Sequence, residues 1–568
     1  MTKEKIIDYI SRTDQVTFLR EIDLPKQKKE TYWLCILACQ FQVEDHKVPI
    51  NICVPKKFPY HLPKFLLPKY DHLGFLPHIE PNGSICYLEK ESIFINIDKP
   101  EVVFQASAEL AIQTLKDGLD GTNQEDFREE FNAFWNGNKF MQPIPFLSLI
   151  EIKDAPQKIQ ILKDNQKGIV FNYGENIAIR KKHFFKQSSP SQKSGLYIPL
   201  ELKSPIHPPT YDERWSVQQF TNWLKPKVST KNWEAITIIL SGKKPTRFQY
   251  IIFGIPRKTG MTLLAGVQLI PKKDKEHPFL SASSDWSLKL FHVTRLDKEA
   301  ILPRSGASID LQKKKALIIG CGSVGSHLAI MLAKAGIGSL SLVDADELKY
   351  ENVHRYAIGM QYSGKKKVEA LKEYLSANLL YTKVTTYPNS IENLMDGTEL
   401  NIDQHNLVIS AVGDPTVNFL LCQQKWKIPF VIGWNEALGI GGHAVIRFPE
   451  KEGCYRCLFR NGYNIASFAA KEQPKPFHKK HLGCGEVFTP YTALDSIRTS
   501  ELMARLSINY LKNKLDKAQI LSWKGDTLDF CQQGFQLSNR YLRQSQVDMN
   551  NNKYNFINPN CPYCKKAI

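Results

Sequence analysis

Residues 313–325 read KKKALIIGCGSVG, and this stretch decides the fold of the second half of the chain. A short, β-rich apolar run ends at Gly320, and an apolar helix pattern then extends to about Gly336. Gly320, Gly322 and Gly325 let backbone amides approach a phosphate closely, and the helix N-terminus favours an anion. The stretch therefore predicts a strand, a glycine turn and a helix that bind a nucleotide phosphate.

A second apolar run, residues 339–343, leads to Asp344. An acid about 20 residues after such a turn accepts a hydrogen bond from a ribose hydroxyl. The pattern fits any adenosine nucleotide, so ATP chemistry and NAD-dependent hydride transfer both stay open at this point.

Four further features favour ATP. Acids and cations recur at set places, namely in Asp344-Ala-Asp346, in Asn352-Val-His-Arg355, in Gly364-Lys-Lys-Lys367 and at Asp414, which follows the apolar run 407–411. Together they resemble the motifs of the ubiquitin-activating and molybdopterin/thiamin adenylyltransferases (ThiF/MoeB type) over most of residues 290–568. The resemblance implies a Rossmann-like α/β adenylation domain that uses ATP and Mg²⁺.

The resemblance also assigns roles. Arg355 and Lys367 would bind the polyphosphate as catalytic cations and offset the charge of departing pyrophosphate. Asp346 and Asn352 would line the nucleotide site. Asp414 stands where the family has its Mg²⁺ ligand, and a carboxylate suits this hard cation. The family usually has Asp-Asn there and this chain has Asp-Pro, so the alternative is that Asp414 only caps the following helix.

Four cysteines form two Cys-x-x-Cys pairs, Cys454 with Cys457 and Cys561 with Cys564. Each pair places two sulfurs on one side of a tight knuckle, and four thiolates make a closed tetrahedral zinc site. A redox role is the alternative for a single pair, but two pairs without a free ligand position favour structural zinc. The site would tie the C-terminus back onto the adenylation domain.

Cys484 lies between these pairs, after a stretch rich in Pro, Lys and His that is typical of an exposed loop. A helix is expected next, over residues 493–511, as in the family's loop that carries an acyl-accepting cysteine. The resemblance makes Cys484 the catalytic acceptor of the activated carboxylate. An unreactive loop cysteine is the alternative, because some family members adenylate without forming a thioester. Cys531 is the weaker rival.

The first 140 residues show a second resemblance. Runs 32–43 and 49–55 look like adjacent strands, and turns then lead through Leu76-Pro-His78 and an Asn-Gly pair to Cys86. This order resembles the ubiquitin-conjugating enzyme fold, an α+β domain. It implies that Cys86 is a second catalytic cysteine that receives the acyl group as a thioester.

This half departs from the family at one motif. The family's His-Pro-Asn is here His78-Ile79-Glu80, so the usual oxyanion-stabilising asparagine is missing, and Asn82 is the candidate substitute. His78 is expected to fix the loop by hydrogen bonds rather than to act as a general base. The few cations near Cys86 in the sequence predict a modest thiolate fraction.

Composition limits the remaining classes. The 568 residues are 42% hydrophobic and 23% charged, which predicts folded domains rather than long disorder. The start lacks a secretory signal, and the uncharged run 316–333 is expected to be the buried strand, turn and helix, so we expect a cytoplasmic protein without a membrane span. Twelve cysteines fit a reducing compartment. The excess of 75 Lys and Arg over 57 Asp and Glu is spread in short clusters, which makes nucleic acid an improbable partner.

The expected layout is a multidomain chain of α/β and α+β class: a conjugating-like domain at 1–142, a middle α/β docking domain at 143–290 and the adenylation domain at 291–568. This order resembles bacterial fused enzymes of CBASS antiphage operons. It implies a donor protein, either a CD-NTase (cGAS-like nucleotidyltransferase) or a ubiquitin-like or sulfur-carrier protein, with a C-terminal glycine or similar. Target lysines and a homodimer are implied as well. An NAD-dependent oxidoreductase and a zinc-stapled nucleic-acid-binding module are the alternatives.

Overall fold

The computed structural model divides into two compact units, Met1–Asp297 and Lys298–Ile568. It describes residues 2–23, 32–68, 73–88, 95–175, 183–185, 188–241, 248–258, 260–272, 276–281, 285–395, 397–424, 426–477, 479–480, 487–488, 490–550 and 555–564. Among these residues, no helix is long and apolar enough to cross a membrane.

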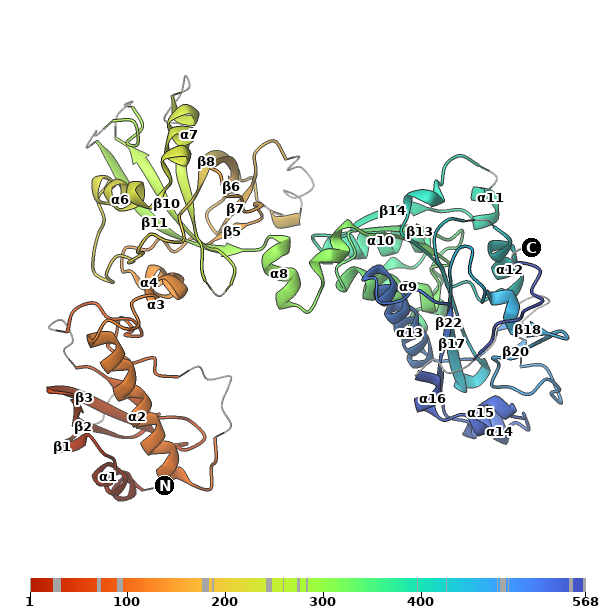
Figure 1. Ribbon diagram of the computed structural model, residues 1–568, viewed down its shortest axis with the longest axis horizontal. Coiled ribbons are helices and arrows are strands. Elements are labelled where there is room, and N and C mark those ends of the chain that lie inside the picture. Colours follow the sequence, from red (N-terminus) through yellow and green to blue (C-terminus); the bar gives the residue numbers. More distant parts are fainter. Residues whose placement is uncertain are drawn as a thin grey trace. The chain divides into compact units, whose positions relative to one another are not determined.

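The chain begins with a helix, an antiparallel four-stranded meander and a long helix (Figure 1). The elements are α1 (Lys3–Ser11), β1 (Val16–Ile22), β2 (Trp33–Val43), β3 (His46–Pro55), β4 (Lys64–Leu66) and α2 (Pro100–Leu119). Buried residues alternate along β2, which leaves one sheet face apolar. Phe41 on this face and Phe104 and Leu115 of α2 belong to one core. The expected adjacent strands at 32–43 and 49–55 are confirmed, because β2 pairs with β3.

The middle of the first unit is a closed barrel of seven strands, in the order β10-β11-β5-β7-β6-β8-β9. The strands are β5 (Phe146–Ser148), β6 (Gln157–Lys163), β7 (Gly168–Asn172), β8 (Ser191–Pro199), β9 (Phe248–Ile255), β10 (Leu263–Pro271) and β11 (Trp286–Arg295). Phe146, Tyr250 and Phe291 form one core cluster, and α6 (Val217–Leu224) and α7 (Thr230–Leu240) contribute to a second.

The predicted α/β layering is therefore wrong for this region. Seven of the eight residues of β9 are buried, because Ile252 belongs to one cluster and Phe253 to the other. Strands buried on both faces read as continuous apolar runs, the pattern of a parallel α/β sheet, and the sequence pattern alone does not reveal barrel closure. The expected boundary at 290/291 falls inside β11.

Two short helices, α3 (Asp126–Glu129) and α4 (Phe131–Gly137), lie before the barrel. They fall within the expected first domain, residues 1–142, but Phe131 and Trp135 belong to a core cluster with barrel residues. The Trp135 indole N–H donates to the Phe291 carbonyl at 3.2 Å. The helices therefore pack against the barrel.

The second unit is built on a seven-stranded sheet in the order β14-β13-β12-β15-β16-β17-β22. Its strands are β12 (Lys315–Ile319), β13 (Ser339–Val343), β14 (Lys383–Tyr387), β15 (Leu407–Ser410), β16 (Phe430–Asn435), β17 (Gly441–Arg447) and β22 (Gln519–Lys524). The first five run parallel to one another, and β17 pairs antiparallel with both of its neighbours, β16 and β22. The predicted strand, turn and helix at residues 313–334 is confirmed, as is the strand 339–343.

Helices cover both faces of this sheet (Figure 1). Core residues of α9 (Ser323–Lys334), α10 (Lys367–Asn378) and α13 (Ala493–Leu511) share a cluster with one face. Those of α11 (Ile391–Met395), α12 (Pro415–Gln423) and the cysteine knuckle share a cluster with the other. This doubly wound arrangement is the predicted adenylation-type architecture.

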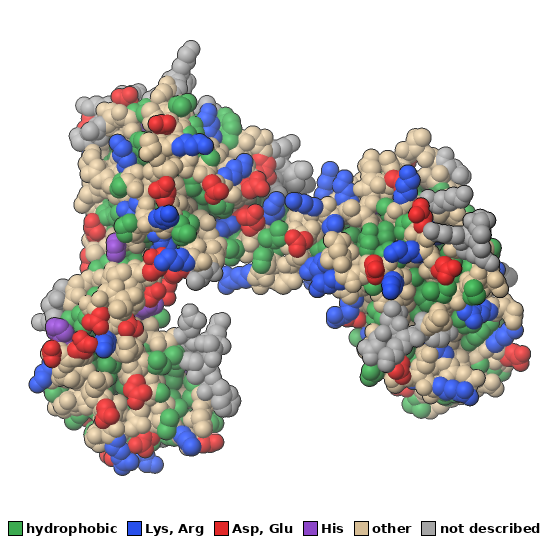
Figure 2. Space-filling view, in the orientation of Figure 1, with side chains coloured by type: hydrophobic (Ala, Val, Ile, Leu, Met, Phe, Trp, Pro, Cys, Tyr) green, Lys and Arg blue, Asp and Glu red, His purple; other side chains and the backbone are tan. Residues whose placement is uncertain are grey.

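The remaining elements are short. They are α8 (Lys298–Arg304), β18 (Phe459–Arg460), β19 (Tyr463–Asn464), β20 (Lys479–Lys480), β21 (Val487–Phe488), α14 (Leu528–Gln532), α15 (Asn539–Arg543) and α16 (Gln546–Asn550). On the face drawn in Figure 2, Lys and Arg side chains are interspersed with acidic and apolar ones, as the dispersed lysine clusters in the sequence led us to expect.

Candidate functional site

The glycine turn after β12 is shaped by two close backbone approaches. Gly320 has φ +85°, a conformation that favours glycine. A Cβ atom on Gly325 would lie 1.8 Å from the Gly320 carbonyl oxygen, so only glycine fits. Gly322 is the N-cap residue of α9 and has open space around its Cα. The turn therefore presents its backbone at the positive end of a helix, where a phosphate binds favourably.

A cavity of about 280 Å³ opens beside this turn. Five of the predicted nucleotide-site residues line it: Gly320, Gly322, Asp344, Asp346 and Lys367. Asn389, Ser390 and Glu392 line it too, and the sequence analysis missed them because they follow β14 without a recognisable motif. The structure thus brings together residues from Ile319 to Val417, since β12, β13, β14 and β15 are neighbouring parallel strands whose carboxyl ends meet at one sheet edge.

Asp344 is the anchor of this cavity. Its Oδ2 accepts a hydrogen bond from the Cys321 backbone N–H at 2.7 Å, and its Oδ1 accepts one from the Asp346 N–H at 2.8 Å. The Lys367 ammonium lies 2.7 Å from Asp346 Oδ2 and 3.9 Å from Asp344 Oδ1. The cation expected to bind polyphosphate is therefore already held at the cavity by two acids.

Arg355 and Asn352 belong to a short 3-10 helix, Tyr350–Arg355, and are not among the cavity's lining residues. The Arg355 guanidinium lies 5.6 Å from the centre of the Tyr491 ring. The Tyr491 hydroxyl is 3.0 Å from the hydroxyl of Ser323, the first residue of α9. Tyr491 carries no sequence motif, and the structure alone connects it with Arg355 and the phosphate-binding turn.

Asp414 is the N-cap of α12, and its Oδ1 accepts a hydrogen bond from the Thr416 N–H at 2.7 Å. Its neighbour Gly413 lines the cavity, whereas Asp414 is exposed next to it. Asp414 thus caps the helix, as the alternative interpretation of the sequence held. Its other carboxylate oxygen can still bind a cation. Metal binding by Asp414 stays a prediction.

The four knuckle cysteines come together as the spacing predicted. The Sγ atoms of Cys454, Cys457, Cys561 and Cys564 all lie within 4.8 Å of one another. The separations are 3.5 Å for Cys454 to Cys561, 3.4 Å for Cys457 to Cys564 and 3.9 Å for Cys454 to Cys457. A tetrahedral zinc ion with Zn–S bonds of about 2.3 Å places its sulfurs about 3.8 Å apart. The donor set therefore fits one zinc ion.

Cys86 is exposed at the end of a tight hairpin. Its backbone N–H donates to the His78 carbonyl at 2.8 Å, and Gly83 closes the intervening turn with φ +81°. Asn82, the candidate oxyanion donor, uses its Oδ1 to accept the Ser84 N–H at 2.9 Å. Asn82 therefore shapes the turn, and it is absent from the described residues that line the pocket at Cys86.

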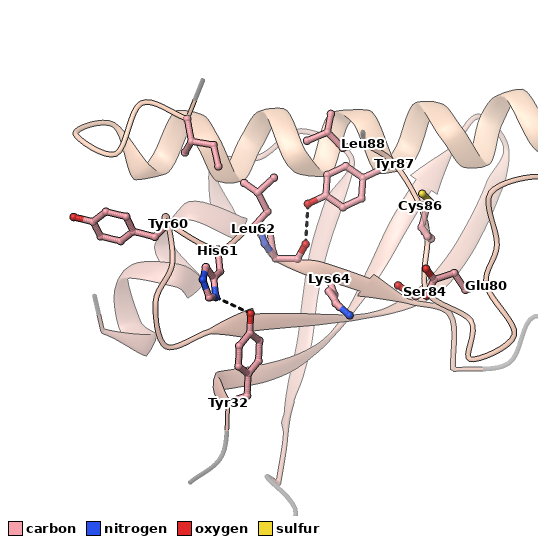
Figure 3. A pocket seen from close by; sticks show the side chains of 13 residues that line it. Tyr32, Tyr60, His61, Leu62, Lys64, Glu80, Ser84, Cys86, Tyr87 and Leu88 are labelled. Atoms are coloured by element: carbon pink, nitrogen blue, oxygen red, sulfur yellow. Dashed lines mark hydrogen bonds between the residues drawn. The ribbon is translucent and has the colours of Figure 1, made fainter. Parts of the chain in front are cut away.

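A pocket of about 440 Å³ adjoins Cys86 (Figure 3). Cys86 and Glu80 lie at one end and Tyr60 at the other. The wall is ordered by two hydrogen bonds of 2.8 Å, one between the Tyr32 hydroxyl and His61 Nδ1 and one from the Tyr87 hydroxyl to a backbone carbonyl. The pocket offers an extended chain a mixed aromatic and polar surface next to the thiol.

His78 lies beside Cys86 with φ +62° and only 20% of its side chain exposed. A hydrogen bond with the Cys86 side chain and contacts with Glu130 and Asp126 raise the pKa of His78 to about 11. The two acids favour the protonated ring, which has no free lone pair to accept a proton, and this supports the expected loop-fixing role of His78 over that of a general base. The sequence shows few cations near Cys86, and the structure adds His78, whose acidic partners come from distant parts of the chain. The thiolate fraction of Cys86 stays a prediction.

The structure describes only one of the two candidate acyl acceptors in the second unit. Cys484 lies outside the described residues. Cys531, the weaker rival, is exposed and belongs to the helix α14.

Comparisons with known proteins agree with this geometry. Residues 301–514 match the ThiF family and residues 20–141 match the prokaryotic E2 family B. The ATP-dependent ubiquitin transferase-like protein Cap2 of Pseudomonas aeruginosa is 24% identical over 77% of this chain and 80% of that protein. The protein of the same name from Escherichia coli is 23% identical over 78% and 81%. The chain is a fused bacterial enzyme with ubiquitin-conjugating-like and ubiquitin-activating-like domains. It is an ATP-dependent adenylyltransferase and ubiquitin-like protein transferase, which replaces the oxidoreductase alternative.

Other relatives match only the adenylating half. The adenylyltransferase and sulfurtransferase UBA4 of Candida albicans is 26% identical over 33% of this chain, which spans 43% of that protein. Among solved structures, Escherichia coli MccB with ATP is 20% identical over 45% of this fused enzyme and 67% of that chain, with a TM-score of 0.30.

The glycine turn gives a stability prediction with a matched control. Gly325→Ala forces a Cβ against the Gly320 carbonyl and destabilises the second unit by about 1–3 kcal/mol. Gly322→Ala meets no atom within 4 Å, so it loses only the preference for glycine over alanine at the N-cap of α9 and lowers the melting temperature less than Gly325→Ala does. Differential scanning calorimetry of the two variants checks this, and equal melting temperatures would contradict the packing described here.

Proposed function

We propose that this enzyme activates the C-terminal carboxylate of a donor protein and ligates it to target lysines. The carboxylate attacks the α-phosphorus of ATP, which releases pyrophosphate and forms an acyl-adenylate. The Cys484 thiolate displaces AMP, the Cys86 thiolate takes over the acyl group, and a lysine amine forms an isopeptide bond while Cys86 is released. The donor is the C-terminus of a CD-NTase, and the setting is antiphage defence.

One observation carries the proposal: a nucleotide-type cavity with a paired lysine and an exposed cysteine on a conjugating-type domain occur in one chain. The two Cap2 relatives, of which this chain covers 80% and 81%, support the assignment to ligation. A ubiquitin-like or sulfur-carrier donor is the second candidate, favoured by the sulfurtransferase relatives of the adenylating half. A homodimer and a cytoplasmic location stay predictions.

The chain's own residues divide the work of adenylation. Asp344 would orient the ribose, the glycine turn would bind phosphate through its N–H groups, and Lys367 and Arg355 would stabilise the charge of the leaving pyrophosphate. Asp414 would hold Mg²⁺, which supplies charge neutralisation at the phosphates. The four knuckle cysteines would hold zinc and fix the C-terminus.

The two roles of Asp414 are separable. Asp414→Asn keeps a side chain that caps helices as well as aspartate but weakens the affinity for Mg²⁺, so ATP–pyrophosphate exchange is lost at wild-type stability. Asp414→Ala loses exchange and about 1 kcal/mol of stability. Exchange at the wild-type rate in the folded Asn variant would leave Asp414 as a helix cap only.

Zinc removal should weaken the second unit, because closed thiolate sites couple metal binding to folding. Elemental analysis should find about one zinc ion per chain, and Cys457→Ser should lose it. Cys531→Ser is the matched control, since Cys531 is exposed and outside the cluster. Finding no metal in the native protein, with all four thiols open to titration, would remove the site.

The order of the two catalytic cysteines is the decisive test of the proposed function. Cys86→Ala should trap the donor on Cys484, and Cys484→Ala should form adenylate yet load neither cysteine. Both thioesters should disappear with reductant, whereas the final amide should survive. Non-reducing gels and ATP–pyrophosphate exchange measure these outcomes.

Cys531→Ala serves as the control and should behave like the wild type. If Cys484→Ala still charges Cys86 at the wild-type rate, Cys484 is not the acceptor. Cys531 or direct transfer from the adenylate must then replace it.

A further inference from the structure

The ring of His78 lies between two carboxylates. Its Nε2 is 2.9 Å from Asp126 Oδ2 in α3, and its Nδ1 is 3.3 Å from Glu130 Oε2 at the N-cap of α4. Both ring nitrogens thus face acceptors that carry negative charge, which a doubly protonated imidazolium satisfies and a neutral ring does not. The backbone N–H of Cys86 donates to the His78 carbonyl at 2.8 Å, and the interaction between the two side chains raises the pKa of His78. The residues that face His78 are therefore two acids and the reactive thiol.

The two acids are held in place by the barrel. Arg128, in the same helix as Asp126, is only 2% exposed, and its guanidinium donates to the carbonyls of Ser204 and Pro256. Pro256 directly follows β9. Arg128 and the apolar face of α4 both pack on the barrel domain. Asp126 and Glu130 are therefore held by the barrel domain rather than by the conjugating domain.

The barrel domain reaches the cysteine hairpin, residues 78–86, a second time. The Tyr211 hydroxyl donates to the carbonyl of Ile79, the residue after His78, at 2.8 Å in a buried setting. Gly137 leaves room for this approach, because a Cβ there would lie 2.7 Å from the Tyr211 ring and 3.1 Å from Pro81 Cγ. The hairpin is therefore fixed from the barrel side at His78 and at Ile79.

Aromatic rings complete this contact. Phe75, just ahead of the hairpin, stacks on Phe127 with 5.0 Å between ring centres and meets Tyr211 and Phe134 edge-on at 5.6 Å. Such pairs contribute beyond the area they bury. A hairpin packed in this way has little freedom to move relative to the barrel domain.

We infer that the barrel domain is a working part of the conjugating site: Asp126, Glu130 and Tyr211 are positioning residues that hold His78 as a fixed cation beside Cys86. This inference rests on the proposed role of Cys86 as acyl carrier. The imidazolium favours the thiolate that attacks the incoming thioester and that leaves again when the lysine attacks. The family's oxyanion-stabilising asparagine is missing here, and the imidazolium provides a positive charge at the reaction site in its place.

The first test measures the thiol itself and needs no donor protein. Iodoacetamide alkylation of the native full-length chain is followed on the Cys86 peptide by mass spectrometry. Asp126→Asn combined with Glu130→Gln should slow alkylation at pH 7 about tenfold, with the gap closing near pH 10, because full ionisation there no longer needs the cation. Glu109→Gln, an exposed acid of α2, is the matched control and should react like the wild type.

His78→Gln should reproduce the same loss, and adding it to the paired acid variant should cause no further change, because all three act through one cation. The single variant His78→Gln also provides the test if the paired acid variant does not fold. Wild-type alkylation at pH 7 in these variants would overturn the inference. Faster alkylation at every pH would do the same, since it would mean that the acids only restrain the hairpin.

The second test addresses the barrel. Tyr211→Phe keeps the ring but loses the bond to Ile79, so charging of Cys86 should fall several-fold while ATP–pyrophosphate exchange is unchanged. Tyr173→Phe, at an exposed position of the barrel domain, is the control. Unchanged charging in Tyr211→Phe would overturn the barrel's part. A wild-type chain that never charges Cys86 would instead refute the proposed function, and the alkylation result would still stand by itself.

Discussion

The adenylating half depends on the two hydrogen bonds that the Asp344 carboxylate accepts. This carboxylate joins the end of β13 to the glycine turn after β12 through the Cys321 N–H, and it orients Asp346 through a second N–H. Asp346 in turn holds Lys367, the first residue of α10. One acid thus sets the relative positions of two strands, a helix N-terminus and a cation before any nucleotide arrives. Preorganisation of this kind is what electrostatic stabilisation of a leaving group requires.

In the conjugating half, a charged group is likewise positioned beside the site by contacts from elsewhere in the chain. Its cysteine hairpin lacks the family tripeptide, and the nearest asparagine is engaged in the turn. The charge beside Cys86 comes from His78, whose protonated state depends on acids that are 48 and 52 residues later in the chain. Its raised pKa means that the ion pair contributes stability below the unfolded value near 6.5 and loses it only as the pH rises through about 11. The cation is therefore present throughout the physiological range.

The sequence predicted what local patterns determine and missed what distant contacts determine. The strand, turn and helix at residues 313–334 and the helix 493–511 were predictable because apolar period, glycine placement and capping all agree there. The four-cysteine knuckle was predictable because sulfur chemistry limits the roles of such spacing. The barrel was not, because β9 is buried on both faces and resembles a parallel strand. Tyr491 and the charge on His78 were not, because their partners lie far away in sequence and carry no motif.

Burial explains how one chain with twelve cysteines can direct an acyl group to few of them. Burial raises the pKa of Cys35 to about 11 and those of Cys39, Cys53 and Cys422 to about 12, so these thiols hold their protons and are out of reach of a donor. Cys321 is fully buried behind the glycine turn, and four more thiols face one another in the knuckle. Within the described part of the chain, Cys86 and Cys531 are the exposed cysteines that are left. Of these two, Cys86 adjoins His78, whose ring lies between two carboxylates, and this neighbour supports the role proposed for Cys86 as the acyl carrier. Burial thus leaves a donor few thiols to reach among the described residues.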